Sequence, residues 1–250
     1  MTTPVEQPVA LITGGAVRVG RAIVQTLAEH GYAVAIHANR SLRQAQQLAD
    51  ELGGQGATAQ VEQAELRDEA AVRAMIDRVH DHFGRLDVLV NSAAIWSPMP
   101  LEQVDANEVR KYFEVNTLGT FICCQHAGLL MAEQTAGGVI VNIGDWSVAR
   151  PYVNYAAYFA SKGAIPTLTR MFAVELSRRN PRVRVNAVLP GPVIFPPDLP
   201  AAERQQAIDS TLVQRAGTPQ NVAHAVLFFT ENDFVTGVCL PVDGGRTIGD

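Results

Sequence analysis

The amino-acid sequence predicts an α/β fold: a Rossmann-like, doubly wound parallel sheet of about seven strands with helices on both faces. Short apolar runs rich in β-branched residues recur along the chain, as is typical of strands that are covered on both faces. Stretches with helical periodicity lie between these runs, and this alternation favours parallel pairing. No repeat, low-complexity tract or linker interrupts it, so we expect residues 1–250 to form a single domain.

The order of the elements follows from these runs and from the residues that end them. We expect strands to begin at Val9, Tyr32, Ala57, Leu86, Gly138, Val183 and Gly237. Periodicity predicts helices over 18–30, 42–52, 68–82, 106–133, about 155–179 and 219–230. Gly31 follows the first helix, the Gly53–Gly54 pair is expected to cap the second, and Pro219 lies in the first turn of the last. The proline-rich stretch 189–200 and the loop 192–212 are expected to lie over a binding site.

Composition and charge exclude several classes of protein. Of 250 residues, 47% are hydrophobic and 18% are charged, and the net charge of −5 comes without a basic run, so we expect no nucleic-acid partner. No stretch of about 20 uninterrupted apolar residues suggests a membrane span, and the first residues do not resemble a secretory signal. Cys123, Cys124 and Cys239 lack metal-binding spacing and are typical of buried thiols in a reducing compartment. The sequence therefore predicts a cytoplasmic protein without a bound metal.

The segment "ALITGGAVRVGRAI", residues 10–23, has the pattern of a strand, a glycine turn and the first turn of a helix. The N–H groups and partial positive charge at such a helix start attract the pyrophosphate of a dinucleotide. Gly14 permits the turn and Gly20 lets the helix approach the strand, with Val19 beside it. Arg18 stands where a third glycine is common, and its charge suits either the pyrophosphate or a bound substrate; the alternative is a side chain in solvent.

The end of the second strand, "IHANRS", indicates which dinucleotide is bound. A site for NAD usually has an Asp or Glu here, about 20 residues beyond the glycine loop, to accept from the ribose 2′-hydroxyl. This chain has Asn39, Arg40 and Ser41 instead. A guanidinium beside a hydroxyl suits a 2′-phosphate, because those hydrogen bonds are charge-assisted. The sequence therefore favours NADPH over NADH, the alternative being an ordinary surface arginine.

Tyr158 and Lys162 form a candidate catalytic pair. They are four residues apart, so they share one face of a helix. A tyrosine has an ordinary pKa of about 10, and a nearby ammonium is expected to lower it and so to make the phenol a better proton donor. Asp145, thirteen residues before Tyr158, follows a strand end, where its carboxylate can bond the tyrosine or a substrate rich in N–H groups; the alternative is a turn cap.

These residues resemble the short-chain dehydrogenase/reductase family over essentially the whole chain. The family's glycine motif corresponds to Thr13–Gly20, and its Asn-Asn-Ala-Gly element after the fourth strand is similar to "NSAA", Asn91 to Ala94. Its Tyr-x-x-x-Lys pair is Tyr158 and Lys162. The resemblance implies that Lys162 also holds the nicotinamide ribose, and that Asn116 supports this lysine through a water. The Pro-Gly after the sixth strand and the "VDGG" near the C-terminus also have counterparts here, Pro190–Gly191 and 242–245.

The resemblance implies further cofactor contacts. Glu65 stands where an aspartate usually lies near the adenine, and its longer carboxylate can still accept from the amino group. The other contacts that the resemblance implies are Val19, Leu66, Asn91, Ala93, Pro190 and Gly191.

The departures from the family pattern are similar to its pteridine reductase branch. Asp145 replaces the usual catalytic serine, and Arg18 replaces the middle glycine, as in that branch's T-G-x-x-x-R-x-G signature. Trp96 follows the fourth strand, where that branch places an aromatic ring to stack on the pterin; the alternative is a packing tryptophan. Ala94 replaces the substrate-contacting serine often found there.

The resemblance implies an NADPH-dependent reductase of a pterin, with Tyr158 as proton donor and Arg18, Trp96 and Asp145 as substrate-binding residues. It also implies a homotetramer with the helices 106–133 and 155–179 at an interface. Two alternatives stay open. A general ketoreductase acting on a 3-oxoacyl thioester would use a serine, for which Ser147 is close enough. A non-catalytic NADPH-binding protein would not need the Tyr158–Lys162 pair.

Overall fold

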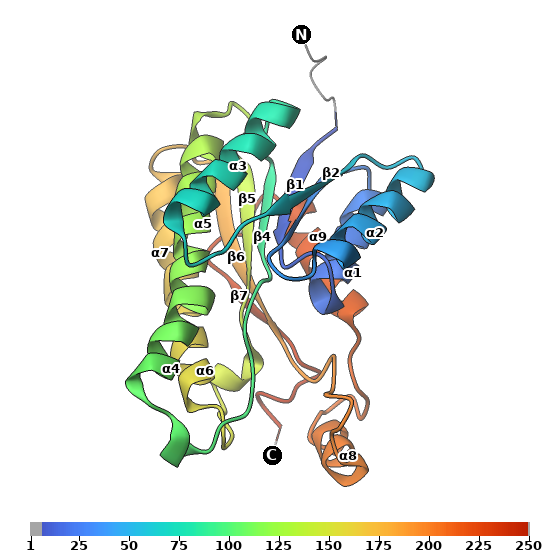
Figure 1. The fold of residues 1–250 in the computed structure, drawn as a ribbon, viewed down its shortest axis with the longest axis vertical. Coiled ribbons are helices and arrows are strands. Elements are labelled where there is room, and N and C mark those ends of the chain that lie inside the picture. The colour runs from blue at the N-terminus through green and yellow to red at the C-terminus, as the bar shows by residue number, and fades with distance from the viewer. Residues whose placement is uncertain (1–6, 250) are drawn as a thin grey trace.

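The computed structural model describes residues 7–249, and its seven strands form one sheet in the order β3-β2-β1-β4-β5-β6-β7 (Figure 1). Every neighbouring pair is parallel. The predicted doubly wound α/β fold is therefore confirmed. The strands are β1 (Val9–Thr13), β2 (Ala33–Ala38), β3 (Ala59–Gln63), β4 (Val88–Asn91), β5 (Gly138–Ile143), β6 (Val183–Pro190) and β7 (Cys239–Val242).

The core consists of two apolar layers, one on each face of the sheet. Along β1 the side chains alternate: Ala10 and Ile12 pack in one layer, and Val9 and Leu11 pack in the other. This alternation follows from the period of two in a strand. Since every residue of β1 is buried, the strand appears in the sequence as an unbroken apolar run.

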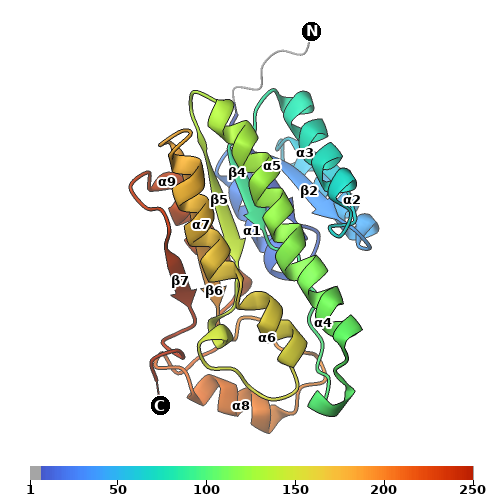
Figure 2. The ribbon, with the colours of Figure 1, turned by 90° about the vertical axis from the view of Figure 1, so that its left-hand side faces the viewer.

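Helices cover both faces. The helices α3, α5 and α7 pack on the face that Figure 2 turns toward the viewer, and α1, α2 and α9 pack on the other. The described helices are α1 (Arg18–Glu29), α2 (Leu42–Gly54), α3 (Glu69–Phe83), α4 (Ala106–Tyr112), α5 (Gly119–Glu133), α6 (Ala156–Lys162), α7 (Ile165–Ser177), α8 (Ala201–Asp209) and α9 (Pro219–Glu231). None of these helices is long and apolar enough to cross a membrane.

Two predicted helix boundaries are wrong. The helix α2 continues through Gly53 and Gly54, which were expected to cap it, and the left-handed turn occurs at Gly56 with φ +87°. The stretch 155–179 is not one helix but two, α6 and α7. Pro166 lies in the first turn of α7, and because proline has no N–H it cannot donate to a carbonyl of α6 and continue that helix.

Two further segments differ from the expected pattern. The predicted helix 106–133 contains a π-helical turn, Phe113–Leu118, between α4 and α5. The predicted loop 192–212 contains α8, none of whose residues is buried. A helix without a buried face has no hydrophobic period, so the sequence carried no signal for it.

Candidate active site

The predicted site residues lie at one edge of the sheet, where the strands end, which is the lower edge in Figure 1. Gly14 follows β1, Asn39 follows β2, Glu65 follows β3 and Asp145 follows β5. The direction in which successive strands are added to the sheet reverses between β1 and β4, because β2 and β3 lie on one side of β1 and β4 to β7 lie on the other. In open α/β sheets ligands bind at such a switch point, outside the carboxyl ends of the strands. The topology therefore brings residues from most of the chain to one crevice.

The glycine turn packs so closely against its neighbours that no side chain fits at two of its positions. Gly14 has φ +64°, and a Cβ added there would lie 2.9 Å from Cα of Ala93. A Cβ at Gly20 would lie 2.1 Å from the carbonyl oxygen of Gly14. Both positions therefore require glycine, as a loop that presents its backbone to a pyrophosphate does. This cradle fits a dinucleotide.

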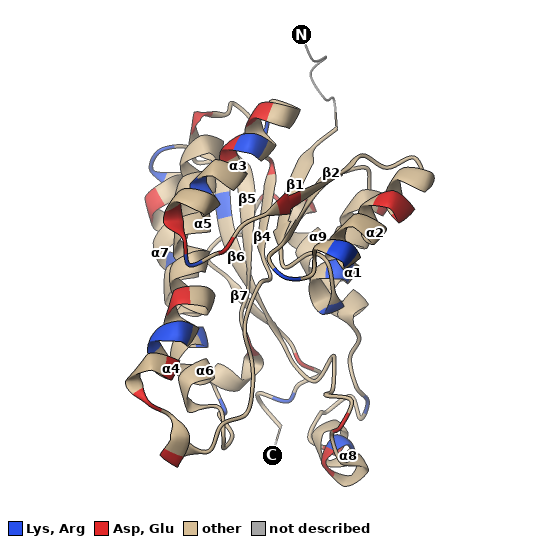
Figure 3. Ribbon diagram, in the orientation of Figure 1, with Lys and Arg blue, Asp and Glu red and all other residues tan. Residues whose placement is uncertain are grey.

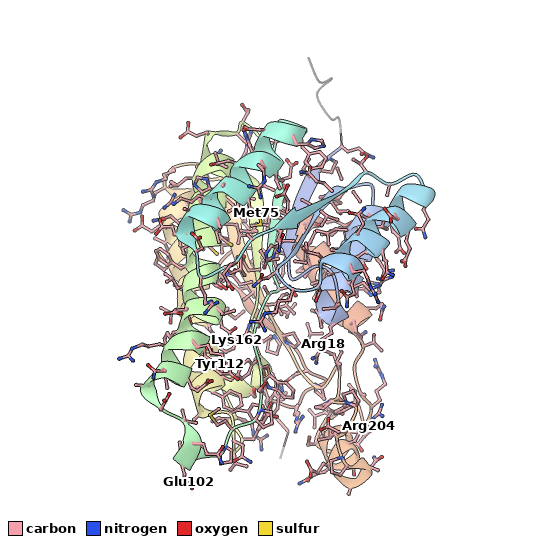
Figure 4. The ribbon with its side chains drawn as sticks, in the orientation of Figure 1. Arg18, Met75, Glu102, Tyr112, Lys162 and Arg204 are labelled. Atoms are coloured by element: carbon pink, nitrogen blue, oxygen red, sulfur yellow. The ribbon has the colours of Figure 1, made fainter. Side chains whose placement is uncertain are left out.

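Arg18 begins α1 in a left-handed conformation, with φ +54°. Such a backbone costs an L residue about 1–2 kcal/mol, which is why glycine is common at this position. Its exposed guanidinium makes no hydrogen bond or ion pair with any residue in the range 7–249, and Figure 4 shows the side chain at the site edge of the sheet. A strained arginine with free donors beside the glycine cradle indicates a functional requirement for its charge.

His37 supports the glycine turn through hydrogen bonds, and no sequence pattern predicted this role. Its Nδ1 accepts from the Gly14 N–H at 3.2 Å, its Nε2 lies 3.0 Å from the Ala64 carbonyl oxygen, and its backbone carbonyl accepts from Gly15. The ring is 1% exposed, and burial lowers the pKa of His37. The neutral ring, with its proton on Nε2, satisfies both contacts.

The ends of β2 and β3 are joined by side chains. Asn39 donates from Nδ2 to Oε2 of Glu65 at 3.0 Å, and Arg67 donates to the same oxygen at 2.9 Å. The hydrogen bonds from Arg67 lower the pKa of Glu65 despite its partial burial. Arg40 is exposed and pairs with no residue in the described part of the chain, and Ser41 is the N-cap of α2. Asn39 and Glu65, both predicted to face the cofactor, thus already engage one another.

The ends of β1 and β4 are joined by Thr13, whose Oγ1 accepts from the N–H groups of Ser92 and Ala93 at 3.1 and 3.2 Å. The side chain of Asn91 points into the core, where it donates to Oδ1 of Asn142 at 2.9 Å. Asn91 can therefore meet a cofactor through its backbone alone. Two other predicted contact residues are partly or wholly packed in the core: Val19 is half-buried and Leu66 is 5% exposed.

Tyr158 and Asp145 form the central pair of the site. The phenol donates to Oδ2 of Asp145 at 2.7 Å. The other carboxylate oxygen accepts from the backbone N–H and the hydroxyl of Ser147, at 2.9 and 2.5 Å, so that Asp145 is also the cap of a short 3₁₀ turn. Burial and the Asp145 carboxylate raise the pKa of Tyr158 well above its ordinary value. Ser147 is fully buried, and its hydroxyl is committed to Asp145.

In this structure the Lys162 ammonium bonds the backbone and not Tyr158, so its effect on the pKa of Tyr158 stays a prediction. Its ammonium donates to the Ile143 carbonyl oxygen at 2.7 Å, and burial lowers the pKa of Lys162 to about 8. A buried ammonium needs an acceptor, and the end of β5 supplies this one. Lys162 remains on the face of α6 that turns toward the sheet edge, as Figure 4 shows.

Asn116 holds the segment after β4 against α6. From the π-helical turn, its side chain bonds both backbone groups of Ile95, at 2.8 and 3.1 Å, and donates to Ser161 Oγ at 3.0 Å. It makes no direct contact with Lys162. Its role as a support for the lysine through a water stays a prediction; what the structure shows is its bond to Ser161, the neighbour of Lys162 on α6.

Trp96 stacks on a protein ring. Its indole lies 4.9 Å from the ring of Tyr155 at an interplanar angle of 16°. Tyr155 in turn meets Tyr158 and Tyr152 edge-on. The prediction that Trp96 stacks on a pterin did not include Tyr155, whose ring already covers one face of the indole. The site is thus lined by a connected group of aromatic rings.

The far side of the site is made by the end of β6 and the C-terminal turn. Gly191 donates its N–H to the Val242 carbonyl oxygen at 3.0 Å, and a Cβ at Gly191 would lie 2.5 Å from Cα of Asp243. Beyond this contact, the Arg246 guanidinium lies over the Trp146 ring, 4.3 Å from its centroid. The sequence offered no signal for Arg246, because the pattern that predicts this segment ends at Gly245.

Comparison with known proteins agrees with this arrangement. A family model described as Enoyl-(Acyl carrier protein) reductase matches residues 15–247. The chain is 31% identical to Pteridine reductase 1 of Leishmania tarentolae, with 99% of each chain covered. It is 33% identical to 3-oxoacyl-[acyl-carrier-protein] reductase of Rattus norvegicus, with 95% of this chain and 97% of that one covered.

A solved structure is similar throughout. A blue fluorescent protein from a metagenomic library, in complex with NADPH, superposes with a TM-score of 0.87 at 31% identity, over 96% of this chain and 97% of that one. Together with the parallel sheet, the glycine cradle and the Tyr158–Lys162 helix, these matches show that the chain belongs to the short-chain dehydrogenase/reductase family of NAD(P)-dependent oxidoreductases.

Proposed function

We propose that this protein is an NADPH-dependent reductase of pterins. The observation that carries the proposal is the bond between Tyr158 and Asp145, since a carboxylate stands where the family usually has a serine. A serine hydroxyl suits a ketone oxygen, to which it donates. A carboxylate accepts, so it suits a substrate that presents N–H groups, as the amino-substituted ring of a pterin does.

The cofactor is held by backbone and charge. The cradle of Gly14 and Gly20 meets the pyrophosphate, and the exposed Arg40 with the Ser41 hydroxyl meets the 2′-phosphate. The similar protein solved with NADPH supports this choice. When bound, NADPH supplies the hydride that reduces the substrate. Pro190 and Gly191, at the end of β6, form the floor that would hold the nicotinamide.

Tyr158 supplies the proton, and Asp145 controls when it is available. In the free site the carboxylate holds the phenol and raises its pKa, so the proton stays on the tyrosine. A substrate amino group that donates to Asp145 competes for Oδ2 and weakens that hold. The phenol is then free to donate to the substrate nitrogen that the hydride transfer makes basic. Lys162, the nearby buried ammonium, offsets the negative charge left on the tyrosine.

The main rival is reduction of a 3-oxoacyl thioester, the class named by the similar reductase of Rattus norvegicus. Ser147 would then have to take the place of the catalytic serine. Its hydroxyl is instead buried and donates to Asp145 at 2.5 Å, which weighs against this role.

The test is NADPH oxidation, followed at 340 nm, with a dihydropterin and an acetoacetyl thioester supplied separately to the purified protein. We expect turnover of the pterin and not of the thioester. Turnover of the thioester alone would replace the proposal with a ketoreductase. Tight NADPH binding without turnover of either would favour a non-catalytic NADPH-binding protein.

We further propose a homotetramer that acts in the reducing cytoplasm. Apolar side chains are exposed along α5 and α7, among them Leu129 and Val174. At the π-helical turn the exposed Phe113 and Leu118 border a hollow of about 370 Å³. Figure 2 shows these helices side by side on one face. Burying them against a second copy removes this apolar surface from water. Sedimentation should show a tetramer, and Leu118→Asp should lower the oligomeric state.

A further inference from the structure

We propose that Arg246 forms an anion-binding subsite, and that the substrate carries a carboxylate or phosphate group next to its reacting ring. This inference rests on the proposed reductase function. It concerns a C-terminal turn, residues 243–249, that is separate from the cofactor cradle. Figure 3 shows basic positions both at the start of α1 and in this last segment of the chain, at the same end of the sheet.

The C-terminal turn is part of the site edge. The N–H of Gly191 bonds to Val242, and the space that a Gly191 side chain would need is filled by Asp243. The turn therefore packs directly on the segment that forms the floor of the site. A group carried by this turn keeps a fixed position relative to that floor.

Asp243 gives the turn its shape. Its Oδ1 accepts from the Gly245 N–H at 3.0 Å, and its Oδ2 accepts from the N–H and the hydroxyl of Thr247 at 2.7 and 2.6 Å. Arg150 donates to the backbone carbonyls of Arg246 and Gly249. Because both Asp243 oxygens accept hydrogen bonds within the turn, this carboxylate organises the backbone and makes no hydrogen bond to the Arg246 guanidinium.

Arg246 is oriented by Trp146. Its guanidinium lies over the indole at 4.3 Å, and Trp146 directly follows Asp145. Face-on stacking occupies the plane of a guanidinium and leaves the N–H donors at its edge free. Within residues 7–249 no acceptor bonds those donors. Burial lowers the pKa of Arg246 below its ordinary value, as expected for a guanidinium held partly out of water.

The charge around the reacting group favours an anionic ligand. Asp145 already accepts from Tyr158 and Ser147, which leaves two arginines, Arg18 and Arg246, without a carboxylate partner among the described residues. A planar guanidinium with free edge donors binds two oxygens of one anion at once. Carboxylate and phosphate both present such a pair of oxygens, so the structure assigns this shared chemistry to the ligand.

The experiment compares dihydropterins that share a ring and differ in charge. Dihydroneopterin is neutral, its monophosphate carries a phosphate, and dihydrofolate carries carboxylates. We measure kcat/KM for each with the wild type, Arg246→Gln and Arg246→Lys. Arg178→Gln is the matched control, since it removes an equal charge from an exposed position after α7, away from the site.

We expect the wild type to prefer an anionic pterin over the neutral one, and Arg246→Gln to reduce that ratio by roughly 10- to 100-fold, the loss expected for one charged hydrogen-bonding pair. Arg246→Lys should keep part of the preference because it retains the charge, and Arg178→Gln should keep all of it. Comparing kcat/KM for dihydroneopterin monophosphate with that for dihydrofolate shows whether the subsite prefers a phosphate or a carboxylate. A ratio that is the same in Arg246→Gln and the wild type would overturn the subsite.

Failure of the pterin proposal can be told apart from failure of this one. Turnover of neutral dihydroneopterin tests the pterin reaction by itself, whereas the ratio between anionic and neutral pterins tests the subsite, so either proposal can fail without the other. If the Gln variant does not fold, the wild type still decides the matter, because added salt should lower turnover of the anionic member of a pair more than that of the neutral one. Equal binding of both members by calorimetry, together with no salt effect, would rule out the subsite.

Discussion

The Tyr158 hydroxyl bonds to Asp145 and not to Lys162: 2.7 Å separates the phenolic oxygen from Oδ2 of the carboxylate, while the ammonium donates to the Ile143 carbonyl. The sequence predicted that the Lys162 ammonium lies beside the phenol and lowers its pKa. In the structure the charged group bonded to the phenol is instead the Asp145 carboxylate. The carboxylate and burial raise the pKa of Tyr158, and burial lowers the pKa of Lys162 to about 8. A proton is therefore kept on the tyrosine until something competes for Asp145.

Asp145→Asn should lower the pH at which Tyr158 ionises. The amide can still accept from the phenol, but it no longer places a negative charge beside the developing phenolate, so the charged form becomes less costly. Ultraviolet difference titration of the tyrosinate, with Tyr158→Phe subtracted to isolate the signal, measures this. An unchanged midpoint in Asp145→Asn would mean that burial alone sets the pKa of Tyr158.

Pterin reduction by Tyr158→Phe should fall by about 100-fold or more, the usual contribution of a general acid, while NADPH binding is kept.

Lys162→Met should stabilise the protein at pH 7 and impair its activity. The pKa of Lys162 is lowered from its usual 10.5 to about 8, so below pH 8 the native state holds an ammonium that would be better solvated in the unfolded chain. The free energy of unfolding should rise by on the order of 1 kcal/mol in the variant, after loss of the bond to Ile143. For the wild type alone, this group should make stability rise between pH 8 and about 10.5, as urea denaturation at several pH values would show. Parallel curves for both proteins would contradict this.

The sheet could be predicted because its signal is local. Strands buried on both faces, such as β1, appear as apolar runs, and each run is complete within a few residues. The predicted secondary structure was wrong where packing against the rest of the fold, or the absence of such packing, decides whether a segment is helical. The exposed α8 has no buried face that could mark it in the sequence. The break between α6 and α7 is different, because its signal, Pro166, is local and was overlooked within the helical period.

The site shows the same division. Motif spacing brought Gly14, Tyr158 and Asp145 to one edge, because the carboxyl ends of parallel strands meet there. Hydrogen-bond partners were not predictable, since they depend on residues far apart in the chain. Asn39 and Glu65 are 26 positions apart and engage one another. His37 was hidden inside an apolar run and can be assigned a role only once Gly14 and Ala64 are seen on either side of its ring.

His37→Leu should weaken NADPH binding by roughly 10-fold, since it leaves the Gly14 N–H without its buried acceptor and so loosens the cradle. His37→Asn should retain most of the affinity, because a side-chain carbonyl can replace Nδ1. The pKa of His37 is lowered below 6.5, so the unfolded chain takes up the proton first, and wild-type stability should fall as pH decreases from 6.5 toward the lower native value. Fluorescence titration with NADPH and thermal melts at several pH values test both points. If His37→Leu binds as tightly as the wild type, the ring does not support the cradle.

Arg18→Gly and Arg18→Ala should separate the strain at this position from its charge. Both variants lose the guanidinium, so both should raise KM for the pterin by roughly 10-fold, the loss expected for a charge-assisted hydrogen bond. Stability should distinguish them, because the left-handed backbone, φ +54°, is unstrained for glycine and strained for alanine by about 1 kcal/mol. The glycine variant should therefore melt at a higher temperature than the alanine variant while showing the same kinetic defect. If both variants kept the wild-type KM, Arg18 would serve neither substrate nor phosphate, and its strained conformation would be an incidental feature of the loop. If instead the glycine variant alone recovered activity, the backbone geometry of the turn, and not the charge, would be the property that the site requires.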